Sequence, residues 1–268
     1  MVTKWDKQRS EWYYRAVEQS NYPERAVKTL LPLLRKCDSV IDIGAGCGAL
    51  SIPIARLVKR VTATEPSKWM YALLLRSAKE AGIKNITAYN SGWLKTGVKG
   101  GLKSKLKPHD MVLCANLPPD IVCNVNFLSY ISKVSGKYVV YLHGAGEWNR
   151  FYYDDLYPLL LGRKYIHDGD YLKTYSFLHG QGIFANTKIF EFYLDQPFKD
   201  FDDAMDFWRH RLKARLTKRK EKILSDFLKK KLISTRNRSR GAGMTGQSNT
   251  LTAPFGLRRA AIMWWKSC

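Results

Sequence analysis

Three glycines and two acidic residues have the types and the spacing of a nucleoside-binding site. Gly44, Gly46 and Gly48 follow an apolar run, and Asp42 stands two residues before the first glycine. Glycines allow a tight turn with no Cβ between backbone and ligand, and a helix after them offers free N–H groups. A second apolar run ends at Glu65, whose two carboxylate oxygens can accept hydrogen bonds from ribose hydroxyls. This order predicts a pocket for a nucleoside-containing cofactor.

Two classes of cofactor fit this skeleton, the dinucleotides and S-adenosylmethionine. Gly44, Gly46 and Ala49 satisfy the loose dinucleotide pattern G-x-G-x-x-G/A, which alone favours neither class. The third glycine is at Gly48, which gives G-x-G-x-G, and Asp42 would repel a pyrophosphate but attract an amino-acid ammonium. These details favour S-adenosylmethionine.

The chain resembles the class I S-adenosylmethionine-dependent methyltransferases from about residue 22 to about residue 194. Their first motif is similar to residues 40–48, and their second is similar to the strand that ends at Glu65-Pro66-Ser67. The resemblance implies that the three glycines lie under the methionine part of the cofactor and that Glu65 binds the ribose. It implies that Asp42 orients the turn or contacts the ammonium through water, while Pro66 and Ser67 shape the next turn, where Ser67 can simply be a helix cap.

The adenine contact departs from the resembling family, which often has an acid after its third strand. This chain has Asn90-Ser91-Gly92-Trp93 there and no acid. Ser91 or backbone groups such as those of Gly92 can replace the acid, and Trp93 can cover the adenine ring. Ordinary core packing is the alternative for Trp93.

The run Asn116-Leu117-Pro118-Pro119 follows the fourth expected strand, and in the resembling fold this loop faces the transferring methyl group. It is similar to the Asn-Pro-Pro-aromatic and Asn-Leu-Pro-Tyr motifs of methyltransferases that act on amino nitrogens of bases or amides. The resemblance implies that Asn116 and a proline-fixed carbonyl accept hydrogen bonds from the target amine. Pro119 and Asp120 stand where those motifs have an aromatic residue, so a proline turn that only closes the strand remains the alternative.

His143 follows the fifth expected strand at the same edge of the sheet. There it can be a general base for an oxygen or carbon acid, or it can be structural. The aromatic residues Tyr13-Tyr14 and those within 148–153 can roof the pocket over a sulfonium, or can be plain packing.

Alternating strands and helices must position these residues. The hydrophobic periodicity predicts helices within 4–35, strands that alternate with helices up to residue 194, and a terminal strand over 260–265. We therefore expect an α/β fold with a Rossmann-like parallel sheet, an antiparallel last strand and a basic helical insertion before it. The expected strands cover 39–43, 61–65, 85–89, 110–115, 137–142 and 187–194, and the expected helices cover 50–58, 67–81, 121–134, 171–178, 201–216 and 219–232.

The domain organisation follows from the same pattern. We expect an N-terminal helical lid (1–38), a Rossmann-like core (39–198), a basic helical insertion with a flexible loop (199–256) and a terminal strand that returns to the core sheet (257–268). Within the insertion, 234–252 is rich in Ser, Gly, Asn, Thr and Arg and is expected to be disordered. A second loop, 95–107, is rich in Gly and Lys and is expected to be mobile. Residues 148–161 are aromatic and fit no element.

The net charge of +22 is concentrated in the insertion, where residues 209–240 contain 14 Lys and Arg residues and only two acids. Such a segment predicts a surface for RNA or another polyanion, or else a solvated helix face. It lacks the interleaved aromatic residues that stack on bases.

The five cysteines have no C-x-x-C spacing, and no apolar run is long enough to span a membrane. We therefore expect reduced thiols, no zinc or other metal site, no membrane partner and a cytoplasmic location. The oligomeric state does not follow from the sequence.

The predicted function is methyl transfer from S-adenosylmethionine to a small-molecule or unassigned acceptor. The alternative is an RNA amino-nitrogen methyltransferase that uses the basic insertion. Two other classes remain open: an NAD-dependent oxidoreductase, and a non-catalytic nucleic-acid-binding protein. Methyl transfer requires mainly that the nucleophile be held in line with the methyl group, so the lack of a strong acid–base constellation is no objection.

Overall fold

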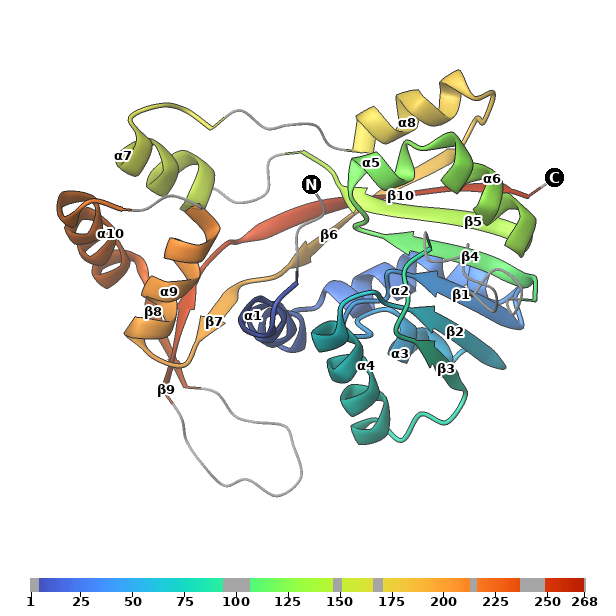
Figure 1. The fold of residues 1–268 in the computed structure, drawn as a ribbon, viewed down its shortest axis with the longest axis horizontal. Coiled ribbons are helices and arrows are strands. Elements are labelled where there is room, and N and C mark those ends of the chain that lie inside the picture. Colours follow the sequence, from blue (N-terminus) through green and yellow to red (C-terminus); the bar gives the residue numbers. More distant parts are fainter. Residues whose placement is uncertain are drawn as a thin grey trace.

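A seven-stranded, mostly parallel sheet forms the centre of the computed structural model (Figure 1). The structure describes residues 5–93, 107–146, 151–165, 171–212, 216–236 and 249–267. The strand order is β3-β2-β1-β4-β5-β10-β6, and β10 is antiparallel to both of its neighbours. The predicted fold class is confirmed. The strands of this sheet are β1 (Ser39–Ile43), β2 (Arg60–Thr64), β3 (Ile86–Tyr89), β4 (His109–Ala115), β5 (Ser135–Gly144), β6 (Asn186–Tyr193) and β10 (Leu257–Lys266).

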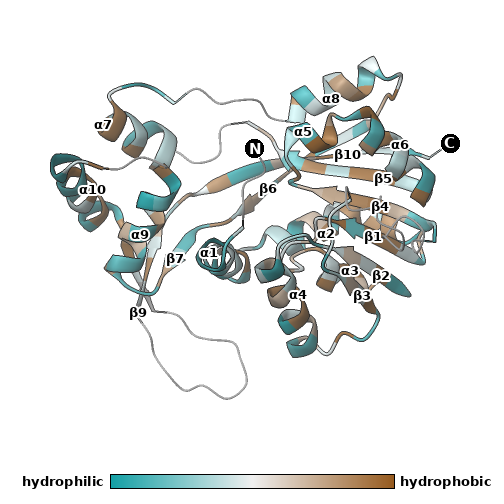
Figure 2. Ribbon diagram, in the orientation of Figure 1, coloured by the Kyte–Doolittle hydropathy of each residue, from teal (hydrophilic) through white to brown (hydrophobic). Residues whose placement is uncertain are grey.

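Helices cover both faces of the sheet, because alternate strand residues point to opposite sides. In β1, Val40 packs into the cluster under α2 and α3, whereas Ile41 and Ile43 pack into the cluster under α6 and α8. Both clusters are buried, and the core strands are correspondingly apolar (Figure 2). The covering helices are α2 (Tyr22–Leu34), α3 (Ser51–Ala55), α4 (Lys68–Glu80), α5 (Pro119–Val122), α6 (Val125–Val134) and α8 (Tyr171–Gly180).

The insertion between β6 and β10 contains a small sheet as well as the two predicted basic helices. Its helices are α9 (Phe201–Leu212) and α10 (Lys218–Lys231), and its strands are β7 (Gln196–Phe198), β8 (Ile233–Arg236) and β9 (Asn249–Ala253), in the order β7-β9-β8. The prediction of disorder over 234–252 was therefore wrong at both ends of that range, since β8 and β9 pair antiparallel. Phe198 and Ala253 bury this sheet against α9, a long-range contact that local composition does not reveal. Residues 237–248 lie outside the described residues.

Two further segments join the hydrophobic cluster of the insertion. The first is the aromatic stretch that fitted no predicted element, which forms the π-helix η3 (Phe151–Leu156) and the helix α7 (Tyr157–Leu161). The second is α1 (Lys7–Glu18), whose Trp12 is buried among residues of the insertion such as Phe207. Figure 1 shows α1 between the core and the insertion.

Two expectations, a mobile loop over 95–107 and the lack of a membrane span, depend on which residues the structure describes. The predicted mobile loop 95–107 lies outside them, apart from residue 107. Within the described residues, none of the helices has both the length and the apolar character that crossing a membrane requires.

Candidate functional site

The glycine turn lies at the carboxyl end of β1 and is tied to the end of β2. Gly44, Gly46 and Gly48 have φ angles of 75°, 58° and 86°, in the left-handed region that favours glycine. The Gly44 amide donates to the Thr64 carbonyl over 2.8 Å, and the Gly46 amide donates to Glu65 Oε2 over 2.9 Å. The turn needs glycine for its backbone conformation and holds its amides close to the acid.

Glu65 is buried, with 5% of its surface exposed, and holds two segments together. Besides Gly46, it accepts a hydrogen bond from the Ser67 amide over 2.7 Å. Burial raises its pKa, although these two N–H groups act in the opposite direction. Ser67 is also the N-cap of α4, and Gly92 lies against the Pro66 ring. The predicted ribose contact of Glu65 stays a prediction.

Asp42 is a buried acid with one oxygen to spare. Its Oδ2 accepts a hydrogen bond from Ser51 Oγ over 2.6 Å, while no group in the described part of the chain donates to Oδ1. Burial raises the pKa of Asp42 to about 6, the hydroxyl of Ser51 lowers it, and the charge of Glu65 raises it. A buried carboxylate oxygen without a partner is costly, and a cationic group of a ligand would relieve that cost.

A cavity of about 40 Å³ brings the predicted residues Asp42, Gly44, Gly46 and Asn116 together. The Asp42 oxygen without a partner and the glycine turn fit a cofactor that carries an ammonium group. The remaining lining comes from α1, α2, the glycine turn and the end of β4: Tyr13, Tyr22, Ala45, Ala49, Leu50 and Ala115.

Asn116 follows β4 in an unusual backbone conformation. Its φ of 54° is the one positive value among the described residues other than glycine, and asparagine tolerates this conformation better than most residues. Its amide donates to the Leu142 carbonyl over 2.8 Å, and its side-chain Nδ2 donates to the Tyr22 hydroxyl over 3.0 Å. Backbone strain of this kind is typical of functional sites. The Leu117 side chain lies across Gly44, where a Cβ would collide with it.

The residues predicted to contact the adenine, Ser91, Gly92 and Trp93, do not line this cavity. Gly92 lies against Pro66 in the turn after β2, and Asn90 Nδ2 donates to the Glu65 carbonyl over 2.8 Å. The Ser91 hydroxyl donates to the Gly92 carbonyl over 3.3 Å. Trp93 packs on α6, with its ring 4.9 Å from that of Phe127. The alternative of core packing thus describes its contacts, and the roles of these three residues in adenine binding stay predictions.

His143 does not line the cavity. Its Nε2 is buried without a hydrogen-bond partner among the described residues, and its ring lies 6.1 Å from that of Tyr141. Burial lowers its pKa to about 4, so the imidazole is neutral at pH 7. Its role as a general base stays a prediction.

Sequence reasoning missed Tyr22 as a residue of the site. Residue 22 lies within the range 4–35 where helices were expected, but no local pattern indicates that its hydroxyl reaches Asn116. Of the aromatic residues expected to roof the pocket, Tyr13 lines the cavity, whereas Phe151 and Tyr152 pack into the insertion. Residues 148–150 lie outside the described residues.

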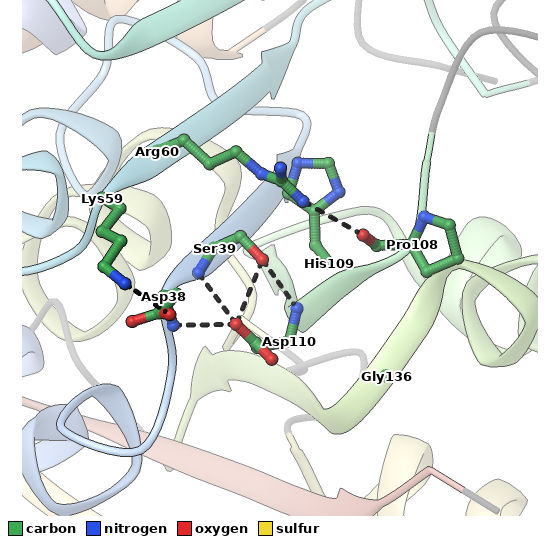
Figure 3. Close-up of a pocket in the computed structure, with 8 residues that line it drawn as sticks. All are labelled: Asp38, Ser39, Lys59, Arg60, Pro108, His109, Asp110 and Gly136. Carbon is green, nitrogen blue, oxygen red and sulfur yellow. Dashed lines mark hydrogen bonds and ion pairs between the residues drawn. The ribbon is translucent and has the colours of Figure 1, made fainter.

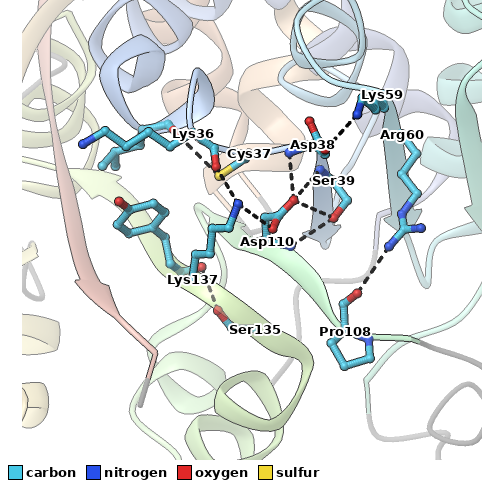
Figure 4. A network of polar contacts seen from close by, with 12 residues as sticks. Lys36, Cys37, Asp38, Ser39, Lys59, Arg60, Pro108, Asp110, Ser135 and Lys137 are labelled. Atoms are coloured by element: carbon cyan, nitrogen blue, oxygen red, sulfur yellow. Dashed lines mark hydrogen bonds and ion pairs between the residues drawn. The ribbon is translucent and has the colours of Figure 1, made fainter.

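A larger cavity of about 430 Å³ lies at the opposite, amino edge of the sheet (Figure 3). Its central acid, Asp110, is saturated by its neighbours: Oδ2 accepts from the Asp38 and Ser39 amides over 2.8 and 3.0 Å, and Oδ1 pairs with Lys137 over 3.0 Å (Figure 4). Ligands of open α/β sheets bind at the carboxyl ends of the strands. The smaller cavity, at that end, is therefore the candidate site.

Comparisons with known proteins point to the same region. The family model described as ribosomal RNA adenine dimethylase matches residues 15–126. The ribosomal RNA small subunit methyltransferase A of Desulforapulum autotrophicum is 30% identical over 91 residues, which cover 34% of this chain. The chain spans 31% of the length of that relative. These matches confirm the predicted resemblance and, with it, the predicted cofactor class.

Solved structures of low sequence identity are also similar. The magnesium protoporphyrin IX methyltransferase of Synechocystis PCC 6803, with bound S-adenosylhomocysteine, is 18% identical with a TM-score of 0.45, covering 67% of this chain and 78% of its own. A SAM-dependent methyltransferase from Aquifex aeolicus is 14% identical with a TM-score of 0.44, covering 69% and 92%.

Proposed function

The chain has the fold and the glycine motif of the class I S-adenosylmethionine-dependent methyltransferases, and we propose that it methylates an amino nitrogen of a base in RNA. The family model and the curated relative both carry ribosomal RNA in their descriptions. The run that begins at Asn116 is similar to motifs that serve amino nitrogens.

The observation that carries the RNA acceptor is the position of the basic insertion. Because β10 is antiparallel to both β5 and β6, β6 runs in the same direction as the parallel strands. The chain therefore leaves β6 at Tyr193 and re-enters β10 at Leu257 at the carboxyl edge of the sheet. The cavity with Asp42 and Asn116 lies at this same edge. The topology thus brings the most basic part of the chain to the side of the sheet where the chemistry is expected.

The charged side chains of α10 are available to phosphates. Lys218, Arg219, Lys222, Lys229 and Lys230 are all exposed. Lysine and arginine side chains that neutralise phosphates release counterions, so RNA affinity gained in this way falls as the salt concentration rises. This dependence is a direct signature of the proposed surface.

The residues of the cavity have distinct tasks in this proposal. When bound, S-adenosylmethionine supplies an electrophilic methyl group. Asp42 balances the ammonium of the cofactor, and the glycine turn lets the backbone approach it. Asn116 Oδ1 accepts a hydrogen bond from the target amine, which orients the nitrogen lone pair and fixes the nucleophile in place.

The test is methyl transfer from radiolabelled S-adenosylmethionine to small-subunit ribosomal RNA transcribed in vitro, with the methylated nucleoside identified by mass spectrometry. We expect an N-methylated base. Binding of S-adenosylhomocysteine without transfer to this RNA, and without salt-sensitive RNA binding, would refute the RNA acceptor and favour a small molecule.

A charge variant tests the role of the insertion. Replacing Lys222, Lys229 and Lys230 with Gln leaves the 3.0 Å ion pair between Lys231 and Asp155 intact. It should weaken RNA binding and make the slope of log affinity against log salt shallower by up to about 2, since each neutralised phosphate contributes about 0.7 on a single strand. Affinity for S-adenosylhomocysteine should not change.

The matched control removes three exposed lysines that lie outside the insertion, in and just after helices of the core. These are Lys28, Lys79 and Lys84, again replaced with Gln. An equal loss of salt dependence in both variants would mean that net charge, and not the insertion, attracts the RNA.

A further inference from the structure

The Tyr22 hydroxyl is placed to control the orientation of the Asn116 side chain. The two residues are 94 positions apart in sequence, yet Asn116 Nδ2 donates to the Tyr22 hydroxyl over 3.0 Å. Both line the cavity that contains Asp42. A carboxamide whose nitrogen is held in this way has its oxygen free to accept a hydrogen bond from another group.

Tyr22 is itself held firmly. Only 3% of its surface is exposed, and its ring packs on two aromatic residues of β6, with centroids 4.9 Å from Phe192 and 6.4 Å from Phe190. The residue before it is fixed to the end of β6, because Asn21 Oδ1 accepts from the Tyr193 amide over 2.7 Å. The hydroxyl is therefore presented from a rigid support and not from a mobile loop.

The charge in the cavity decides which way the hydroxyl acts. A tyrosine hydroxyl can donate or accept, so by itself it would tolerate either orientation of the amide. Burial raises the pKa of Tyr22, and the charge of Asp42 raises it further, so the hydroxyl keeps its proton. The same negative charge attracts that proton, which leaves an oxygen lone pair for the Asn116 amide nitrogen.

We propose that Tyr22 is a positioning residue that keeps the Asn116 carboxamide oxygen directed toward the acceptor, and so selects acceptors that donate a hydrogen bond. A flipped amide would present N–H groups to the target amine, and two donors repel each other. This inference rests on the proposed function, since it names what makes an amino nitrogen the preferred target.

The first test compares two variants that each remove one tyrosine hydroxyl. Tyr22→Phe keeps the ring on β6 but loses the contact with Asn116. Tyr71→Phe is the matched control. It removes a hydroxyl of α4 that donates to the Ala88 carbonyl of β3, and Tyr71 does not line the cavity. With saturating S-adenosylmethionine and ribosomal RNA, we expect kcat to fall about tenfold for Tyr22→Phe, the loss of one hydrogen bond, with both KM values within about twofold. Tyr71→Phe should match the wild type.

A double-mutant cycle shows whether Tyr22 acts through Asn116. In an Asn116→Ala background, Tyr22→Phe should lower kcat no further, because the group that it positions is gone. Losses that multiply would show an independent role and overturn the proposal. Wild-type kcat in the single Tyr22→Phe variant would overturn it as well.

A readout without turnover separates this proposal from the proposed function. In ¹⁵N-labelled protein, the side-chain amide signals of Asn116 are identified by their loss in Asn116→Ala. They should shift in Tyr22→Phe and stay unchanged in Tyr71→Phe. Unshifted signals in Tyr22→Phe would refute the contact even if RNA is methylated. Signals that shift in Tyr22→Phe, together with a wild type that methylates no RNA, would refute the proposed acceptor and leave the contact established.

Discussion

Replacing Asp42 with Asn is expected to stabilise the free protein while weakening its affinity for the cofactor. Asp42 is 2% exposed, and its ionised form is therefore poorly solvated. The variant keeps an oxygen that can accept the 2.6 Å hydrogen bond from Ser51 but removes the buried charge. A residue that costs stability and is placed to bind a cation is expected to serve the ligand more than the fold.

The stability effect follows from the pKa of Asp42, which burial raises from 3.8 to about 6. The folded state thus binds this proton more tightly than the unfolded state. Stability from this group is fully present below pH 4 and falls as the pH rises toward 6. Each pKa unit corresponds to about 1.4 kcal/mol, so the ionised group costs about 3 kcal/mol at pH 7. Since a buried amide also has a cost, Asp42→Asn should gain about 1–3 kcal/mol at pH 7 and little at pH 4.

Whereas Asp42→Asn should stabilise the free protein, it should weaken the affinity for the cofactor. Below pH 6 a cationic ligand must displace a proton from Asp42. Affinity for S-adenosylhomocysteine should therefore fall about tenfold between pH 7 and pH 5, where about one tenth of the free protein is ionised. Calorimetric titration at pH 5, 6 and 7 measures this slope, and urea unfolding at pH 4 and 7 measures the stability. Glu65→Gln is the control, because Glu65 also has a raised pKa.

Two results would refute this reasoning. A variant that is less stable than the wild type at pH 7 would show that the charge of Asp42 supports the fold. A pH dependence of affinity that is retained in Asp42→Asn and lost in Glu65→Gln would assign the titration to Glu65. The expected pattern is the reverse, with the slope lost only in Asp42→Asn.

Two further predictions concern the framework around the site. Asp203→Ala removes the acceptor of the 2.8 Å hydrogen bond from Trp12 and the 2.8 Å ion pair with Arg15, so it should cost about 2–4 kcal/mol in urea unfolding and speed amide exchange in α1; unchanged exchange in α1 would contradict it. Asp110→Asn should cost about 1–2 kcal/mol without changing cofactor affinity. Partial burial raises the pKa of Asp110, but its hydrogen bonds outweigh this and lower the pKa to about 2. The wild type should therefore lose the stability that ionised Asp110 contributes as the pH falls from about 4 to 2. Acid titration followed by circular dichroism should show no such loss in Asp110→Asn.

The sequence predicted the core sheet well, because its signals are local and strong. The continuous apolar run of β4 and the glycine turn after β1 placed these elements within a residue or two. The pairing of β6 with β10 across the long insertion was also confirmed. The small strands β8 and β9 were missed, because their sequences, ISTR and NTLTA, are mostly polar and are strands only where a partner covers them.

The site was predictable where one motif supplied it and not where distant parts meet. Asp42, Gly44 and Gly46 come from one motif, and the structure brings Asn116 to the same cavity. Tyr22 has no local pattern that indicates its contact, which depends on the packing of α2 against β6. Trp93 shows the reverse case, since its place after β3 suggested a ligand contact but its ring packs on Phe127.

The helix α1 gives the insertion and the cavity a shared support. Neighbouring residues of a helix point about 100° apart, so Trp12 and Tyr13 face different surroundings. Trp12 is buried in the hydrophobic cluster of the insertion, and its carbonyl accepts a hydrogen bond from Gln196 over 3.1 Å. Tyr13 lines the cavity. A displacement of α1 therefore changes both surroundings at once. Where a ligand at the insertion and a ligand in the cavity each favour one position of α1, linkage requires that each changes the affinity for the other by the same factor.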